Sequence, residues 1–137
     1  MIKSFEHVGM VTGHMDRSLA FYCDLLGLRL RLRKTMASGT EVAFLDTGNG
    51  MLEIFAPPDG AATALDLAPA TSGVLHITFL VDSVDESFAK LEAAGVAVRE
   101  RPRPAVNSEV IDRVAFLRDP DGITVELAER RNELSPG

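Results

Sequence analysis

Cysteine, positive charge and long apolar runs are all scarce in this sequence. Its 137 residues include one cysteine, Cys23, so an internal disulfide framework is excluded. The formal net charge is −6 at pH 7, which argues against a nucleic-acid surface, because such surfaces cluster Lys and Arg. No apolar run approaches the roughly 20 residues of a membrane span. We therefore expect neither a nucleic acid nor a membrane among the partners.

Signatures of several common chemistries and of export are missing too. The sequence has no Gly-rich phosphate loop, no Ser–His–Asp order and no haem or flavin motif. The N-terminal residues MIKSFEHVGM run straight into a strand pattern without the apolar segment of a signal peptide. We therefore expect a cytoplasmic protein. The length and a 46% hydrophobic composition are sufficient for one domain with a real core.

The most informative feature that is present is an internal repeat. His76 follows His7 by 69 residues, Glu126 follows Glu53 by 73, and the tetrapeptide VAFL occurs at 42–45 and again at 114–117. An Asp nine residues after each His, at positions 16 and 85, is placed to cap a helix that ends at a Gly. Each half has the pattern of one strand, one helix and three strands. The repeat therefore predicts an α+β fold of two tandem βαβββ modules.

The two modules are expected to form a single domain that spans residues 1–137. Module one covers about 1–56, the linker 57–72 and module two about 73–130. The linker region is rich in Pro, Gly, Ala and Thr and has no long periodic segment. At most one short helical turn is expected there, at TALDL (63–67).

Four residues at matching positions of the repeat form the candidate site: His7, Glu53, His76 and Glu126. Strand alternation puts each of them on a partly polar face, opposite an apolar face that packs on the helices. A lone His or Glu in a strand is more often solvent-facing than a metal ligand, but joint occurrence in two repeats favours a shared metal site. Two imidazoles and two carboxylates suit one divalent ion such as Zn, Ni, Co or Mn. The thiolates of a closed structural zinc site are lacking.

Arginines recur at every second position in one predicted strand of each module, which leaves two interpretations open. They are either the solvated face of a strand or a guide for an anionic substrate tail. The six residues are Arg29, Arg31, Arg33, Arg99, Arg101 and Arg103.

The segments HVG, MDRSLAFYCDLLGL, LHITFLV and RDPDGITVEL, together with Glu53, resemble the vicinal oxygen chelate superfamily of glyoxalases, bleomycin resistance proteins and dioxygenases. The resemblance covers essentially the whole chain. It implies strands that curl into an open, barrel-like sheet around one divalent metal, and commonly a homodimer. A Glu ligand in both modules is most similar to glyoxalase I (lactoylglutathione lyase), with methylmalonyl-CoA epimerase close by. By position, His7, Glu53, His76 and Glu126 would be the ligands, and Glu53, Glu126 or both would be the catalytic base.

The resemblance implies a metal-dependent lyase or isomerase that moves a proton alpha to a carbonyl, through an enediolate or enolate, on a thioester or hemithioacetal-like substrate. Val11 stands where bacterial glyoxalase I carries an Arg for the glutathione carboxylate, so the thiol carrier stays open. FLDTGNGMLEIFAP is similar to the epimerase, whereas RDPDGITVEL is similar to the glyoxalase. Two further alternatives are an Fe(II) dioxygenase-like enzyme, in which Glu53 would be surplus, and a small-molecule or antibiotic-binding protein, which would not need the metal ligands.

Overall fold

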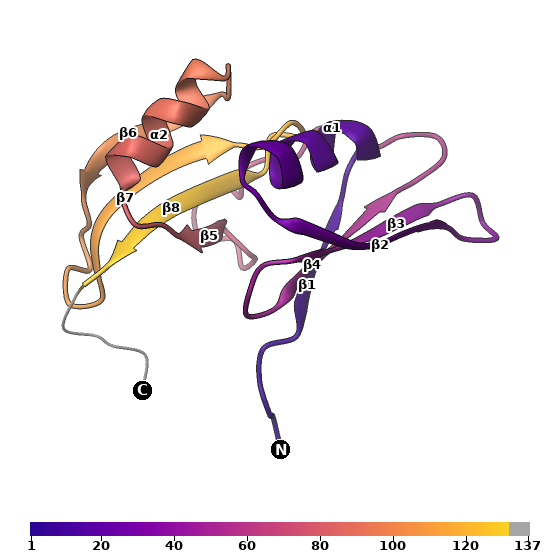
Figure 1. Ribbon diagram of the computed structural model, residues 1–137, viewed down its shortest axis with the longest axis horizontal. Coiled ribbons are helices and arrows are strands. Elements are labelled where there is room, and N and C mark those ends of the chain that lie inside the picture. Colours follow the sequence, from indigo (N-terminus) through magenta and orange to yellow (C-terminus); the bar gives the residue numbers. More distant parts are fainter. Residues whose placement is uncertain (132–137) are drawn as a thin grey trace. The chain divides into compact units, whose positions relative to one another are not determined.

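Residues 1–131 are described by the computed structural model, and they fall into two compact units, the first from Met1 to Thr63 and the second from Ala64 onward. Figure 1 shows that each unit consists of a sheet with a helical segment against it. The first unit contains β1 (His7–Val11), α1 (Met15–Leu19), the π-helical η1 (Ala20–Leu25), β2 (Arg29–Thr35), β3 (Glu41–Asp46) and β4 (Met51–Ala56). The second contains β5 (Ile77–Leu80), α2 (Val84–Ala93), β6 (Val98–Pro104), β7 (Ile111–Arg118) and β8 (Thr124–Arg130). The predicted α+β class and the order βαβββ in each half are confirmed.

Both sheets have the same topology. The strand orders are β1-β4-β3-β2 and β5-β8-β7-β6, with a parallel pair at one edge (β1 with β4, β5 with β8) and antiparallel pairs elsewhere. The parallel register places Gly9 opposite Glu53 in the first unit and Thr78 opposite Glu126 in the second. Within the segment LHITFLV (75–81), β5 starts only at Ile77, which pairs with Val125. The same parallel register puts His76 opposite Thr124, the first residue of β8, and leaves Leu75 beyond the end of that strand.

The helix starts differ from the predicted N-caps. Ser83 occupies the N-cap of α2, where its hydroxyl accepts a hydrogen bond from the Glu86 N–H at 3.2 Å, so Asp85 lies inside the first turn. In the first unit, α1 begins at Met15, so Asp16 also lies inside the helix. Both carboxylates are paired instead with arginines of neighbouring strands, Asp85 with Arg113 (2.9 Å) and Asp16 with Arg33 (3.0 Å).

The core of each unit lies on one face of its sheet. Alternate residues of β4 and β8 are at most 2% exposed, namely Leu52, Ile54, Val125 and Leu127. Complete burial of such a side chain contributes about 1.5–3 kcal/mol. The residues between them, Glu53 and Glu126, therefore point to the opposite face, as the alternation predicts.

The linker is held by the second unit rather than by a helical turn of its own. The predicted turn at TALDL is absent: the Ala64 N–H donates to the Asp121 carbonyl at 2.8 Å, and the Asp66 carboxylate accepts from Arg118 at 2.9 Å. These outside partners replace the hydrogen bonds that a helix would supply. None of the helices among residues 1–131 is long and apolar enough to cross a membrane.

Candidate metal centre

The first unit brings together His7 and Glu53. His7 opens β1 and Glu53 lies in the adjacent parallel strand β4, and their Nε2 and Oε1 atoms are 3.3 Å apart. Solvent reaches 37% of the His7 side chain and 19% of the Glu53 side chain. The other ring nitrogen, Nδ1, lies 3.6 Å from Glu6 Oε1, so a second carboxylate is near the imidazole.

The second unit repeats this pair with His76 and Glu126. His76 directly precedes β5 and Glu126 lies in the parallel partner β8, with Nε2 and Oε1 again 3.3 Å apart. The residue before His76 is Leu75, whereas the residue before His7 is Glu6. Each predicted His therefore meets its predicted Glu within its own unit.

Each imidazole also contacts a phenylalanine edge to face. The His7 and Phe44 rings are 5.9 Å apart at 81°, and the His76 and Phe116 rings are 5.6 Å apart at 73°. Both phenylalanines pair with the site Glu of their unit across β3–β4 and β7–β8. Such contacts favour one ring orientation. Sequence reasoning did not include Phe44 and Phe116 in the site, although the repeated VAFL that contains them was the available signal.

One hydrogen bond distinguishes the two pairs. The Thr78 hydroxyl donates to Glu126 Oε1 at 2.5 Å. The residue opposite Glu53 in the equivalent register is Gly9, which has no side chain to offer. Glu126 is therefore held by a neighbouring hydroxyl, and Glu53 has no equivalent donor at that position.

The donor atoms fit a divalent first-row metal. Two ligand atoms at right angles, each about 2.1 Å from one ion, lie about 3 Å apart, close to the 3.3 Å in each pair. Imidazole nitrogen and carboxylate oxygen are both suitable donors. Within residues 1–131, no group of three or more His, Cys, Asp or Glu residues that could hold an ion is found. Each unit by itself thus offers two candidate ligands.

Cys23 is not part of this arrangement. It is a free, half-buried cysteine in η1. Burial, and then the neighbouring Asp24 carboxylate, raise the pKa of its thiol above the ordinary value. A raised pKa disfavours the thiolate form that binds metals.

The arginine rows have different interaction partners in the two units. In the first unit all three are paired: Arg29 and Arg31 donate to Asp46, and Arg33 donates to Glu41. The exposed pattern of β2 agrees with the solvated-face interpretation.

In the second unit the row is broken up. Arg101 donates to Glu92 of α2 and lies over the Phe88 ring, whereas Arg103 lies over the ring of Phe116, the residue that also contacts His76. The hydrogen bond that Arg101 donates lowers the pKa of the Glu92 carboxyl group. Arg99 donates to Thr124 at 2.9 Å. Two irregularities in the pairing of β6 with β7, between Val98 and Arg103, end the strict alternation that the sequence predicts.

Comparison with known proteins agrees with this architecture. Residues 4–127 match the family model of the glyoxalase/bleomycin resistance protein/dioxygenase superfamily. A probable lactoylglutathione lyase of Synechocystis is 30% identical, over 90% of this chain and 92% of its own. The uncharacterised Escherichia coli protein YaeR is 31% identical, over 94% and 98% of the two chains. The crystal structure of a glyoxalase family protein from Enterococcus faecalis superimposes with a TM-score of 0.76, at 26% identity, over 93% of this chain and 98% of that one. The chain belongs to the glyoxalase/bleomycin resistance protein/dioxygenase superfamily.

Proposed function

We propose that this protein is a divalent-metal-dependent lyase or isomerase of the glyoxalase I type. The observation that carries the proposal is the duplicated His–Glu pair, with the same 3.3 Å separation and the same phenylalanine contact in both units. A binding protein would not need this duplication. The Synechocystis relative named a probable lactoylglutathione lyase supports the same class of reaction.

In this proposal, His7, Glu53, His76 and Glu126 hold one Zn, Ni, Co or Mn ion. When bound, the ion supplies Lewis-acid stabilisation of the negative charge that develops on the substrate oxygen. Glu53, Glu126 or both remove the proton from the carbon beside the carbonyl and return it to the product. The two pairs complete one site, either within a chain or between the chains of a cytoplasmic homodimer.

In this proposal the substrate is a hemithioacetal or a thioester, and its thiol carrier need not be glutathione. Val11 ends β1 and is 52% exposed, so the position that carries the glutathione-binding Arg in bacterial glyoxalase I is accessible but uncharged here. A thiol carrier without a carboxylate at that place is therefore favoured.

The test is metal analysis of the purified protein, combined with activity on the hemithioacetal of methylglyoxal and several thiols. Each assay is made before chelation, after chelation and after reloading with a single metal. About one ion per site and activity that chelation abolishes and reloading restores would support the glyoxalase assignment. Bound metal without this activity would redirect the assignment to the methylmalonyl-CoA epimerase-like alternative. Iron-dependent oxygen uptake would point to a dioxygenase, and failure to bind any metal would overturn the proposal.

A further inference from the structure

A cavity of about 160 Å³ opens on the second unit, between the linker and the sheet. Leu65, Leu67, Val74, Leu75 and Ile123 contribute apolar side chains to its walls, and polar atoms make up the larger part of the surface that faces the cavity. The charged side chains in the lining are Asp66 and Arg99. Its composition is that of a site for a small molecule with an apolar body and one charged group.

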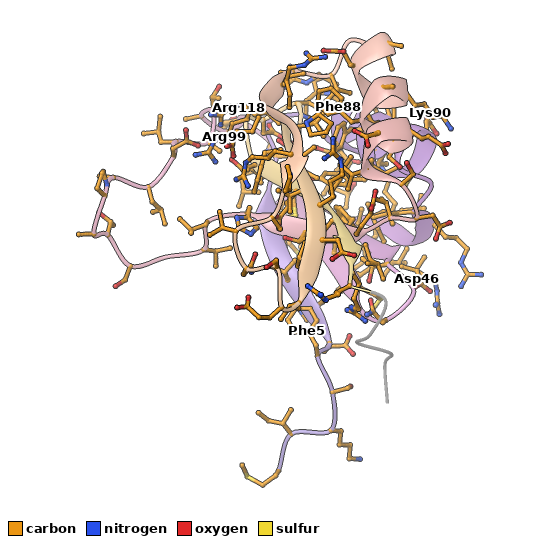
Figure 2. The ribbon with its side chains drawn as sticks, turned by 90° about the vertical axis from the view of Figure 1, so that its left-hand side faces the viewer. Phe5, Asp46, Phe88, Lys90, Arg99 and Arg118 are labelled. Carbon is orange, nitrogen blue, oxygen red and sulfur yellow. The ribbon has the colours of Figure 1, made fainter. Side chains whose placement is uncertain are left out.

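The charges around the cavity are unequally matched. Arg118 donates two hydrogen bonds to the Asp66 carboxylate, from Nη1 to Oδ1 at 3.0 Å and from Nη2 to Oδ2 at 2.9 Å. These hydrogen bonds lower the pKa of Asp66. Arg99 donates a hydrogen bond to the neutral Thr124 hydroxyl, and no ion pair joins it to a carboxylate among residues 1–131. The Asp66 carboxylate is nevertheless near enough that the charge of Arg99 also lowers its pKa. Figure 2 shows Arg99 and Arg118 on the side of the unit where the linker runs, away from Phe88 and Lys90 of α2. One of two neighbouring guanidinium groups is thus neutralised and the other is available to an anion.

A break in strand pairing aims Arg99 into this cavity. Regular alternation would place Arg99 and Arg101 on the same face, but the pairing of β6 with β7 shifts between Val98 and Glu100. Arg101 consequently contacts Glu92 and Arg99 contacts Thr124. Bulges that turn a side chain away from its regular face are frequent beside functional sites.

The linker wall of the cavity is held at several points. Besides the Asp66–Arg118 pair, Ala64 donates its N–H to the Asp121 carbonyl at 2.8 Å. Gly73 lies so close to Leu67 that a Cβ added to Gly73 would be 2.8 Å from Leu67 Cδ1. The wall is therefore formed before any ligand arrives, which reduces the entropy that binding must overcome.

The cavity adjoins the second His–Glu pair. Leu75 in its lining directly precedes His76, and Thr124 in its lining lies two residues before Glu126 on the same face of β8. Two residues along a strand correspond to about 7 Å. A molecule whose anionic group meets Arg99 can thus place a carbonyl a few bonds away near His76 and Glu126.

We infer that Arg99 and Thr124 form a carboxylate subsite, and that the substrate is a short-chain carbonyl compound with a carboxylate a few bonds from its reacting carbon. This inference rests on the proposed function for the link to catalysis, but the subsite itself does not depend on a bound metal. The apolar walls accept the chain between the two groups.

The first experiment titrates hexanoate into the full-length protein in the presence of a chelator, followed by ¹⁵N–¹H correlation spectra. We expect saturable shifts around 64–67 and 122–124, and binding about tenfold weaker for the neutral analogue hexanamide and for Arg99→Gln, because a charge-assisted hydrogen bond is lost. Arg101→Gln is the matched control, two residues along the same strand, and should bind hexanoate as the wild type does. Arg99→Lys keeps the positive charge and should retain most of the hexanoate binding. It is the variant to measure if Arg99→Gln folds poorly.

Equal binding of hexanoate and hexanamide, or wild-type binding of hexanoate by Arg99→Gln, would overturn the subsite. If hexanoate binds as described but the protein has neither metal nor lyase activity, the subsite stands and the proposed function fails. Where activity is present, hexanoate should inhibit competitively, and Arg99→Gln should raise KM only for substrates that carry a carboxylate. Non-competitive inhibition would contradict the assignment of the subsite to the substrate.

Discussion

The two units present the same His–Glu pair in different surroundings. In the first, His7 has Glu6 beside it and Glu53 faces Gly9; in the second, Leu75 precedes His76 and Thr78 donates a hydrogen bond to Glu126. A hydroxyl that holds a carboxylate limits its rotation, whereas a glycine leaves space around it. The comparison teaches that repeated residues need not have equivalent roles. Under the proposed function, Glu126 is suited to a fixed position, and Glu53 would be the carboxylate that moves between ligand and base.

Removing either carboxylate should have the largest effect and should expose this difference. We expect Glu53→Gln and Glu126→Gln each to lower kcat by at least about 100-fold, the usual contribution of a general base. Per bound metal ion, the loss should be larger for Glu53→Gln. Metal content and kcat measured on the same samples decide the matter, and activity that simply follows occupancy in both variants would exclude a base role.

Changing the residue opposite either carboxylate should make the two His–Glu pairs more alike. Thr78→Ala removes the hydroxyl from Glu126 and should weaken metal affinity about tenfold, the lower range for partners of ligating groups. A competition titration against a coloured chelator measures this change without relying on activity. Thr78→Ser retains the hydroxyl and should retain the affinity.

Gly9→Thr makes the converse change by placing a hydroxyl opposite Glu53. An added Cβ at Gly9 meets only Phe55 Cε2, at an ordinary 3.9 Å, so the strand can accept the side chain. We expect lower kcat with unchanged or tighter metal binding, because Glu53 becomes held as Glu126 is. An unchanged kcat would show that mobility of Glu53 is not required.

The histidine–phenylalanine contact should contribute similarly in the two units, with an addition from Arg103 in the second. Phe44→Leu should lower the free energy of unfolding by about 1 kcal/mol, since an aromatic pair contributes about 0.5–1.5 kcal/mol beyond burial. Phe116→Leu should lower it by about 0.5–1 kcal/mol more, because it also removes the cation–π contact with Arg103. Urea denaturation monitored by circular dichroism provides the values. A difference between the variants well beyond this range would mean that the geometric repeat is not an energetic one.

The smallest expected effect is the pH dependence of the Asp66–Arg118 ion pair. Because Arg118 lowers the pKa of Asp66 below its ordinary 3.8, the pair contributes fully above that pH and is lost only as the pH falls further, through the lowered pKa. Hydrogen exchange at the Ala64 amide should therefore be insensitive to this pair from pH 7 to 5, after correction for intrinsic rates. Asp66→Asn should accelerate that exchange at pH 7. Identical protection in the variant would show that the backbone bond to Asp121 suffices to hold the linker.

The strand faces and the two pairs were accessible from the sequence because they depend on short-range rules. Alternation fixes the side of Glu53 and Glu126, and the repeat matches each with its His. The path of β6 was not accessible, since an extra residue in a strand leaves the alternating arginines of the sequence unchanged. Pro102 was the available warning, because proline inside a strand is typical of bulges and edges. The role of Thr78 depends on its register with Glu126, which only the folded sheet defines.

The pairing of Asp66 with Arg118 also has a consequence for synthesis of the chain. The two residues are 52 positions apart, and Arg118 emerges from the ribosome after most of the second unit. All strand pairs of the first unit, in contrast, lie within residues 7–56. Because domains fold as units during translation, N-terminal parts first, the first unit can complete its sheet while the linker is still a free tether. The order of synthesis thus separates the folding of two similar sheets and lowers the chance that a strand of one repeat pairs with the sheet of the other.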